Sequence, residues 1–184
     1  MEFIDKIKIR LHYYYLDKAL KINQSTNHYS MDYESTKSIG ILFDASQLEY
    51  REVVTQFIDR LRRSGKSVKA LGYINEKQKQ EFFAFHHFSN KELDFALRPK
   101  EAEILAFQNE NFDILFNLYF GSVYPLQYIS ALSKATFRVG PSTEQTYCYD
   151  LMLQTNKNKD LGRFISQAES LLKKMNQKYE ATAV

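Results

Sequence analysis

The stretch Ser38-Ile-Gly-Ile-Leu-Phe-Asp44 decides the fold class. Its interior positions are apolar without alternation, so a strand formed from it would hide both of its faces from water. Strands buried on both faces are typical of parallel sheets that carry helices on each side. The segment therefore predicts an inner strand of an α/β protein.

The residues after this strand predict a helix and a second strand. Ser46 and Glu49 have the spacing of a capping box, in which each side chain binds a free amide of the other residue. Gly65 supplies the left-handed residue that commonly follows a helix. Ser67–Ile74 is the next apolar run, so we expect a strand–helix–strand unit here.

The rest of the chain alternates in the same way. We expect Ser89 and Glu92 to form a second capping box, Pro99 to begin a helix and Gly140-Pro141-Ser142 to turn the chain. The further strands expected are 82–88, 112–119, 137–139 and 147–153, and the further helices are a short one from Asn75, one ending near Asn109, one from Tyr124 and one over 159–178. Alternating strands and helices pair in parallel through right-handed crossovers. The prediction is an open, mostly parallel, doubly wound sheet of five to six strands, Rossmann-like or flavodoxin-like, with flanking helices.

The amino-terminal segment has a different character. Residues 3–22 repeat apolar side chains at helical spacing, and residues 23–36 are polar and irregular. We therefore predict two parts. Residues 1–36 form an amphipathic helix with a polar linker, and residues 37–184 form a single α/β domain that includes the carboxyl-terminal helix.

Composition narrows the class of protein. The chain has 184 residues, a net charge of +3, 13 Tyr, 14 Phe and one cysteine, Cys148. A single cysteine allows no internal disulfide, which suits a reducing compartment, and we expect it to be a core thiol. No secretory signal pattern opens the sequence, and no apolar run is long enough for a membrane span. We expect a cytoplasmic protein.

Several familiar motifs fail on inspection. Gly65-Lys66-Ser67 resembles the end of a phosphate-binding loop, but Arg60 stands where its first glycine belongs and a strand follows it. Strand one is not followed by the glycine pattern of dinucleotide-binding proteins, so no cofactor is expected. His86 and His87 would point to opposite faces of a strand and cannot share a metal ion. We therefore predict no metal site.

Polar residues follow the predicted strands, and the carboxyl ends of the strands are where open α/β sheets bind ligands. Asp44 and Ser46 follow the first strand, and Tyr73 and Asn75 end the second. The fourth and fifth strands add Asn117, Arg138, Ser142 and Thr143. Asp44 and Glu49 are the candidate general bases, and Arg138 is the candidate for holding a phosphate or carboxylate. Each also has a structural alternative, such as a helix cap for Ser46 and Asn75 or an ion pair for Arg138.

Two basic helices suggest a partner surface. Residues 157–178 carry six Lys or Arg against two acids, and the first helix presents Lys8, Arg10, Tyr14 and Lys18 as candidate partner-binding residues. A solvated helix face explains the same charges. An unidentified protein partner is expected, a tyrosine-rich helix would also pair two copies of the chain, and nucleic acid is not favoured because the total charge is modest.

The sequence also resembles two known groups of proteins. The stretches that carry the first resemblance are Ser38–Ser46, Gly65–Tyr73, Phe112–Leu118, Tyr128–Ala135 and Phe137–Gly140. Together they resemble an uncharacterised bacterial family of unknown function over most of 37–153, which implies a fold and no activity. Asp113 and Arg138-Val139-Gly140 are similar, more distantly, to the acceptor-side half of heptosyltransferase-like glycosyltransferases.

The departures from the glycosyltransferases affect their chemistry. Leu48-Glu49 stands near the place of the Gly-Asp whose acid is that family's catalytic base. The second, nucleotide-sugar-binding half has no counterpart after Leu153. The resemblance therefore implies a shared fold with lost or changed chemistry.

Three interpretations of function follow. The first is a non-catalytic binding or interaction module, because no catalytic constellation stands out from its structural alternatives. The second is an enzyme or sensor for a nucleotide or sugar phosphate, with its site at the strand ends. The third is association with RNA or the ribosome through the basic helices.

Overall fold

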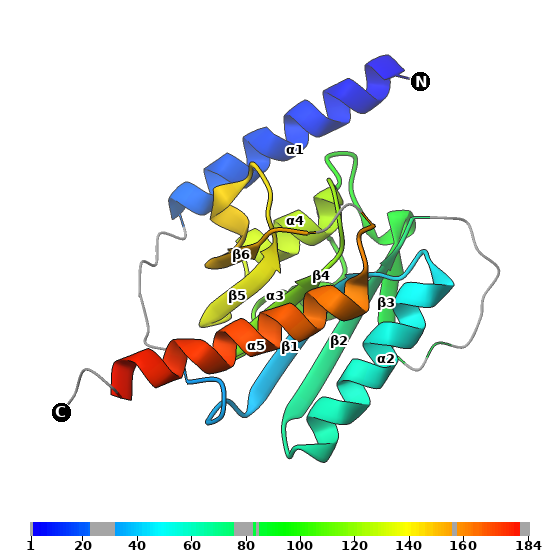
Figure 1. The fold of residues 1–184 in the computed structure, drawn as a ribbon. Helices are drawn as coiled ribbons and strands as arrows, with labels where there is room; N and C mark the ends of the chain where they lie inside the picture. The colour runs from blue at the N-terminus through cyan, green and yellow to red at the C-terminus, as the bar shows by residue number, and fades with distance from the viewer. Residues whose placement is uncertain (1, 23–31, 76–82, 84, 156–157, 181–184) are drawn as a thin grey trace.

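The computed structural model describes residues 2–22, 32–75, 83, 85–155 and 158–180, which contain a six-stranded sheet (Figure 1). The strands are β1 (Ser38–Asp44), β2 (Ser67–Ile74), β3 (His86–Ser89), β4 (Ile114–Leu118), β5 (Phe137–Pro141) and β6 (Leu151–Leu153). Their order is β3-β2-β1-β4-β5-β6, and every neighbouring pair is parallel. The predicted doubly wound α/β sheet is thus confirmed.

The first two strands have the predicted bounds. Ser38 pairs with Ser67 and Asp44 with Tyr73, so the two carboxyl ends lie level with each other. The five inner residues of β1 are buried, as the unbroken apolar run predicts. Gly65 has a φ of 84°, which confirms its role as the left-handed residue after the preceding helix.

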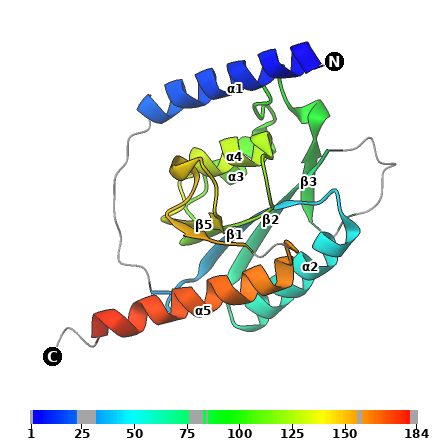
Figure 2. The same cartoon turned by 45° about the horizontal axis from the view of Figure 1, so that its top comes forward.

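The helices cover both faces of this sheet. They are α1 (Glu2–Ile22), α2 (Leu48–Arg63), α3 (Ala102–Gln108), α4 (Tyr124–Ala131) and α5 (Leu161–Glu180), with short 3₁₀ turns η1 (Asn90–Glu92) and η2 (Thr146–Cys148). Figure 2 shows α2 and α5 on one face and α3 and α4 on the other, with α1 lying outside α4. Each face buries its own apolar cluster, so the sheet separates two cores.

The amino-terminal helix packs on the domain. Leu16 is 1% exposed and joins the core beneath α4, and His12 is fully buried beside it. Of the predicted linker, residues 23–31 lie outside the described residues. Tyr33 is buried in the other core, between α2 and α5, so this end of the predicted linker is part of the packed protein.

Several elements differ from the sequence prediction. Pro99 forms an antiparallel bridge with Leu93 and does not begin a helix, because α3 starts later, at Ala102. Gly140 and Pro141 extend β5 and do not turn the chain. The third, fourth and sixth strands are shorter than predicted, and the start of the third falls partly outside the described residues.

The two predicted capping boxes have opposite outcomes. Ser89 and Glu92 form one at η1, where the Ser89 amide donates to Glu92 Oε2 at 2.7 Å. Ser46 and Glu49 do not, because Gln47 is the N-cap of α2 and makes no side-chain capping bond. The short helix predicted after Asn75 lies outside the described residues.

Candidate functional site

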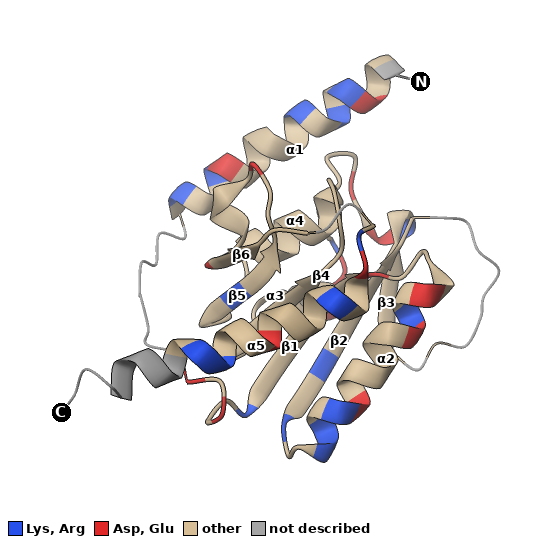
Figure 3. Cartoon of the chain, viewed as in Figure 1, with Lys and Arg blue, Asp and Glu red and all other residues tan. Residues whose placement is uncertain are grey.

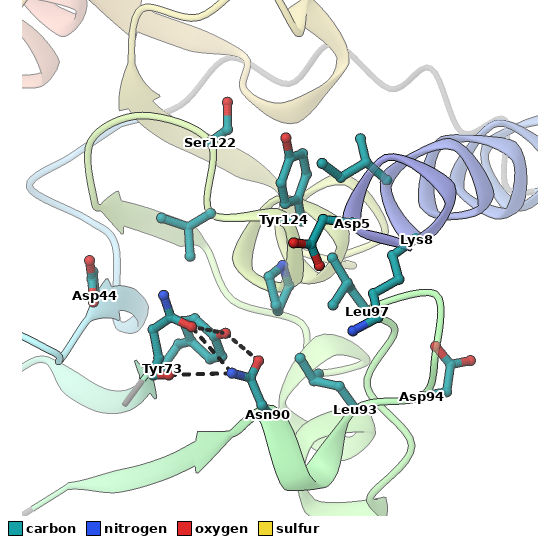
Figure 4. A pocket seen from close by; sticks show the side chains of 14 residues that line it. Asp5, Lys8, Asp44, Tyr73, Asn90, Leu93, Asp94, Leu97, Ser122 and Tyr124 are labelled. Atoms are coloured by element: carbon teal, nitrogen blue, oxygen red, sulfur yellow. Dashed lines mark hydrogen bonds between the residues drawn. The ribbon is translucent and has the colours of Figure 1, made fainter. Parts of the chain in front are cut away.

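A cavity of about 480 Å³ lies where three strands end. It opens beside β1, where the chain connections switch from one face of the sheet to the other, which is the usual ligand position in this architecture. Figure 4 shows the side chains that surround it, from the strand ends, the loops that follow them and α1. Its polar lining residues are Asp5, Lys8, Asp44, Tyr73, Asn75, Asn90, Asp94, Ser122 and Tyr124. We call this cavity the strand-end pocket.

A hydrogen-bonded trio forms one wall of the pocket. The Tyr73 hydroxyl lies 2.7 Å from Asn90 Oδ1 and 3.3 Å from Asn75 Oδ1. The Asn90 amide nitrogen in turn donates to Asn75 Oδ1 at 3.2 Å. Burial, with a contribution from the Asp44 charge, raises the pKa of Tyr73 to about 12, so its hydroxyl stays protonated and remains a donor at neutral pH.

The loop after β1 is bound to this wall. Asp44 Oδ1 accepts the Ser46 amide at 3.0 Å, and Ser46 Oγ accepts the Asn75 amide at 3.0 Å. Ser46 is therefore committed to joining the ends of β1 and β2, which is why it does not cap α2. Glu49 is exposed on the first turn of α2 and does not line the pocket.

The loop from 93 to 98 forms the opposite wall. Asp94 accepts the amides of Ala96 and Arg98, each at 2.9 Å, and its carboxylate pairs with the Arg98 guanidinium at 2.7 Å. Burial works to raise the pKa of Asp94, but the bonds from Arg98 and these amides hold it below its usual range. The Arg98 guanidinium also stacks on Tyr15 of α1, 3.8 Å from the ring centroid. This wall is therefore fastened to α1.

Helix α1 closes the pocket from above. Asp5, Lys8 and Ile9 line it, and one turn further on His12 fixes the helix to the domain. His12 Nδ1 lies 3.1 Å from the Ala96 carbonyl oxygen, which the neutral ring satisfies as a donor. The rings of Tyr13, Tyr124 and Tyr128 surround it at centroid distances of 5.6, 5.6 and 5.7 Å.

The buried site of His12 predicts that the folded protein loses stability in acid. Burial lowers the pKa of His12, with Arg98 acting in the same direction and the Ala96 carbonyl and Asp94 opposing it. Its Nε2 atom is buried without a partner among the described residues. Below its unfolded pKa of about 6.5 the unfolded chain takes up a proton that the folded chain resists. Stability from this group is therefore complete above about pH 6.5 and falls as the pH drops further.

We expect His12→Phe to remove that pH dependence. Between pH 7.5 and 5.5 the wild type should lose up to about 1.4 kcal/mol more of its free energy of unfolding than the variant. Urea unfolding of both proteins at both pH values measures the difference, since the other histidines are common to the two. Equal losses would show that His12 is not held in its neutral form.

The remaining ligand-binding candidates lie outside the pocket. Asn117 is fully buried in β4 and donates to the Val139 carbonyl at 3.1 Å. Ser142 and Thr143 follow β5 at the same edge of the sheet but do not line the cavity. The structure thus brings together Asp44, Tyr73 and Asn75 of the predicted strand-end residues.

The two residues that carry the glycosyltransferase resemblance have structural partners. Asp113 precedes β4 and accepts the amides of Lys37 and Ser38 at 2.7 and 2.9 Å, so it joins the starts of two strands. Arg138, near the start of β5, binds Asp150 through Nε and Nη2 at 3.0 and 2.9 Å. Both lie toward the amino-terminal edge of the sheet, opposite the pocket. The alternative of an ion pair for Arg138 is therefore the one that the structure shows.

The other sequence candidates are placed as follows. Cys148 is buried, and burial raises the pKa of its thiol to about 12, as expected of a core thiol. It lies in η2 and not in a strand. His86 and His87 are exposed neighbours on the edge strand β3. Among the described residues no group of three or more His, Cys, Asp or Glu is arranged to hold a metal ion.

The partner-binding candidates divide between two surfaces. Lys8 faces the pocket, with its ammonium 5.6 Å from the centroid of the Phe95 ring. Arg10, Tyr14 and Lys18 are exposed on α1. Figure 3 shows the basic residues of α1 and α5 interspersed with acidic ones, and these two helices cover opposite faces of the sheet. The two basic helices therefore do not combine into one surface, and a partner for either remains a prediction.

Several pocket residues were not found from the sequence. Asn90 comes directly after β3, and the rule that found Asn75 would have selected it had the strand been ended at Ser89. Asp5, Asp94 and Tyr124 have no comparable signal, because they reach the pocket only through the docking of α1 and the fold of two loops.

Fold and pocket together define a Rossmann-like α/β protein with a polar cavity at its strand ends. The chain belongs to a family described as "Family of unknown function (DUF6913)", whose model matches residues 8–175. Comparison with curated proteins and with solved structures gave no match. In the part of the chain that the structure describes, no helix has the length and apolar character needed to cross a membrane.

Proposed function

We propose that this protein is a binding module that takes up a small polar molecule in the strand-end pocket. The observation that carries the proposal is the cavity itself, at the switch point of the sheet between the Tyr73–Asn75–Asn90 trio and α1. Its volume of about 480 Å³ is within the range of small-molecule sites. The residues that line it bring donors and acceptors together from four separate segments of the chain, as a site that orients its ligand requires.

Binding without catalysis is favoured by the way in which the polar groups are used. An activated nucleophile needs a base within hydrogen-bond reach. Among the described lining residues, no serine hydroxyl donates to a carboxylate or an imidazole, and the Tyr73 hydroxyl meets only asparagine amides. The glycosyltransferase resemblance adds no base, because Glu49, which stands near the place of that family's catalytic acid, is exposed on α2 and does not line the pocket. We therefore propose a receptor or sensor in place of a transferase.

A thermal-shift panel of polyols, amines, nucleotides and sugar phosphates tests the proposal. One chemical class should raise the melting temperature, and a ligand at 100 times its Kd should stabilise the fold by about 2.7 kcal/mol. For a chain of this size that corresponds to roughly 5–11 °C. Each variant below is compared with its own ligand-free melting temperature.

Asn90→Ala should abolish the shift, because it removes one member of the pocket wall. Asn109→Ala is the matched control, since Asn109 is exposed, lies outside the pocket and bonds only the Leu105 carbonyl of its own helix among the described residues. The proposal fails if no compound shifts the wild type, or if the shift survives unchanged in Asn90→Ala.

A further inference from the structure

The charges that line the strand-end pocket are unbalanced. Asp94 is neutralised by Arg98 at 2.7 Å, which leaves Asp5 and Asp44 as carboxylates without a cation at salt-bridge distance among the described residues. Lys8 is the lining residue that opposes them, and its ammonium lies over the Phe95 ring. The pocket therefore has one negative charge in excess, shared between the end of β1 and the underside of α1.

The two carboxylates approach the cavity from different elements. Figure 4 shows Asp44 at the strand end and Asp5 on α1, with the space of the pocket between them and the Tyr73–Asn90 bond forming the wall below. Asp44 uses Oδ1 for the Ser46 amide, at 3.0 Å, and keeps Oδ2 as a further acceptor. A ligand seated here meets acceptors on two sides.

The same lining is poorly suited to an anion. The loop after β1 has no glycine-rich turn, and its Ser46 amide is already bound to a carboxylate. Pro125 occupies the first turn of α4 at the pocket and offers no amide hydrogen. Arg138, which the sequence suggested for a phosphate, is bound to Asp150 on the far side of the domain. Apart from Lys8 on α1, a nucleotide or sugar phosphate would thus meet carboxylates where it needs donors.

We infer that the pocket takes a small organic cation, a primary amine on a hydroxylated carbon chain, with the ammonium against Asp44 and the hydroxyl groups toward the Asn75 and Asn90 amides. This assignment rests on the function proposed above and specifies its ligand class. An ammonium supplies three donors to carboxylate acceptors, and such charge-assisted bonds are about twice as strong as neutral ones. Asp5 gives the ligand a second carboxylate on α1, so a bound amine would also hold α1 over the site.

Three matched probes test the assignment by titration calorimetry on the full chain. Glucamine carries the amine, sorbitol is its neutral counterpart, and sorbitol 6-phosphate is its anionic counterpart. We expect glucamine to bind at least about tenfold more tightly than sorbitol, and the phosphate to bind more weakly than either. Added salt should weaken the binding of glucamine and leave that of sorbitol unchanged, which tests the charge without any substitution.

Asp44→Asn should reduce the affinity for glucamine to that for sorbitol. Asparagine keeps the oxygen that accepts the Ser46 amide, so the loop is preserved. Asp59→Asn, at an exposed position of α2 outside the pocket, is the control and should change nothing.

The outcomes separate the ligand class from the pocket function. Equal affinity for glucamine and sorbitol, tighter binding of the phosphate, or full glucamine affinity in Asp44→Asn would each overturn the cation assignment. If sorbitol 6-phosphate binds and Asn90→Ala abolishes that binding, the cation assignment is overturned while the proposed pocket function is supported. Absence of binding by all three probes also overturns the cation, and the wider panel then decides the pocket function by itself.

Discussion

Gly140→Ala is expected to lower the free energy of unfolding by about 3 kcal/mol, at the upper end of the usual cost of overpacking a core. A Cβ atom on Gly140 would lie 2.7 Å from three atoms of the Tyr149 ring. That ring has no room to move, because Tyr149 is 5% exposed and its hydroxyl bonds Tyr119 at 2.7 Å. The backbone is held as well, since Gly140 pairs with Met152 in the sheet. The melting temperature should fall by roughly 6–12 °C.

Gly162→Ala is the matched control for this prediction. Gly162 lies in the first turn of α5, where an added Cβ meets only Asp160 Oδ1, at an ordinary 3.5 Å. Alanine stabilises helices relative to glycine by up to about 1 kcal/mol, so this variant should melt at or above the wild-type temperature. Differential scanning calorimetry of the three proteins compares them. A Gly140→Ala protein that melts with the wild type would show that the Tyr149 ring does not lie against β5.

The inner strands could be predicted because their signal is local. β1 is apolar on both faces, β2 ends at Ile74 just before Asn75, and Gly65 fixes the turn between α2 and β2. Each of these features acts within a few residues of the chain, so burial and backbone preference point to the same bounds. The parallel order then follows from the alternation of strands and helices.

The wrong predictions fall where a distant contact decides. Ser46 has the sequence context of a cap, but its hydroxyl accepts the amide of Asn75 from the next strand. Pro141 has the sequence context of a turn, yet it is the last residue of β5. The pairing of β5 with β4 stops at Val139, so the amide hydrogen that Pro141 lacks costs no hydrogen bond to β4. Local signals of this kind cannot show which of two available partners the fold supplies.

The candidate site divides in the same way. Asp44, Tyr73 and Asn75 could be found because the carboxyl ends of parallel strands meet at one edge. The side of the pocket that α1 forms could not be predicted, because the periodicity of α1 identifies an apolar face without showing what packs against it. The docking of α1 depends on His12 entering a seat built from Ala96, Tyr124 and Tyr128, which lie more than 80 residues away along the chain. The part of the strand-end pocket that α1 contributes therefore depends on tertiary packing, which local sequence signals do not show.

Glu169→Ala is expected to lower the free energy of unfolding by about 2–3 kcal/mol, because Glu169 joins three segments and leaves a buried hydroxyl behind when removed. Its carboxylate accepts two bonds from Arg60 of α2, at 3.0 and 2.7 Å, and one from the Tyr33 hydroxyl at 2.8 Å. Tyr33 is only 3% exposed, and its burial together with the Glu169 charge raises its pKa. Arg60 is more than half exposed and can return to water, so most of the cost is the unpaired Tyr33 hydroxyl.

A double-mutant cycle isolates that cost. In a Tyr33→Phe background no hydroxyl is left without a partner, so Glu169→Ala should destabilise the protein by at least about 1 kcal/mol less than it does in the wild type. Lys174→Ala is the control on the same helix, because Lys174 is exposed and has no bond or ring contact to Tyr33 or Glu169 among the described residues, so its loss should cost less than about 0.5 kcal/mol. Additive losses in the cycle would contradict the buried bond. A positive coupling would instead show that Tyr33 is anchored to α5 through this buried bond.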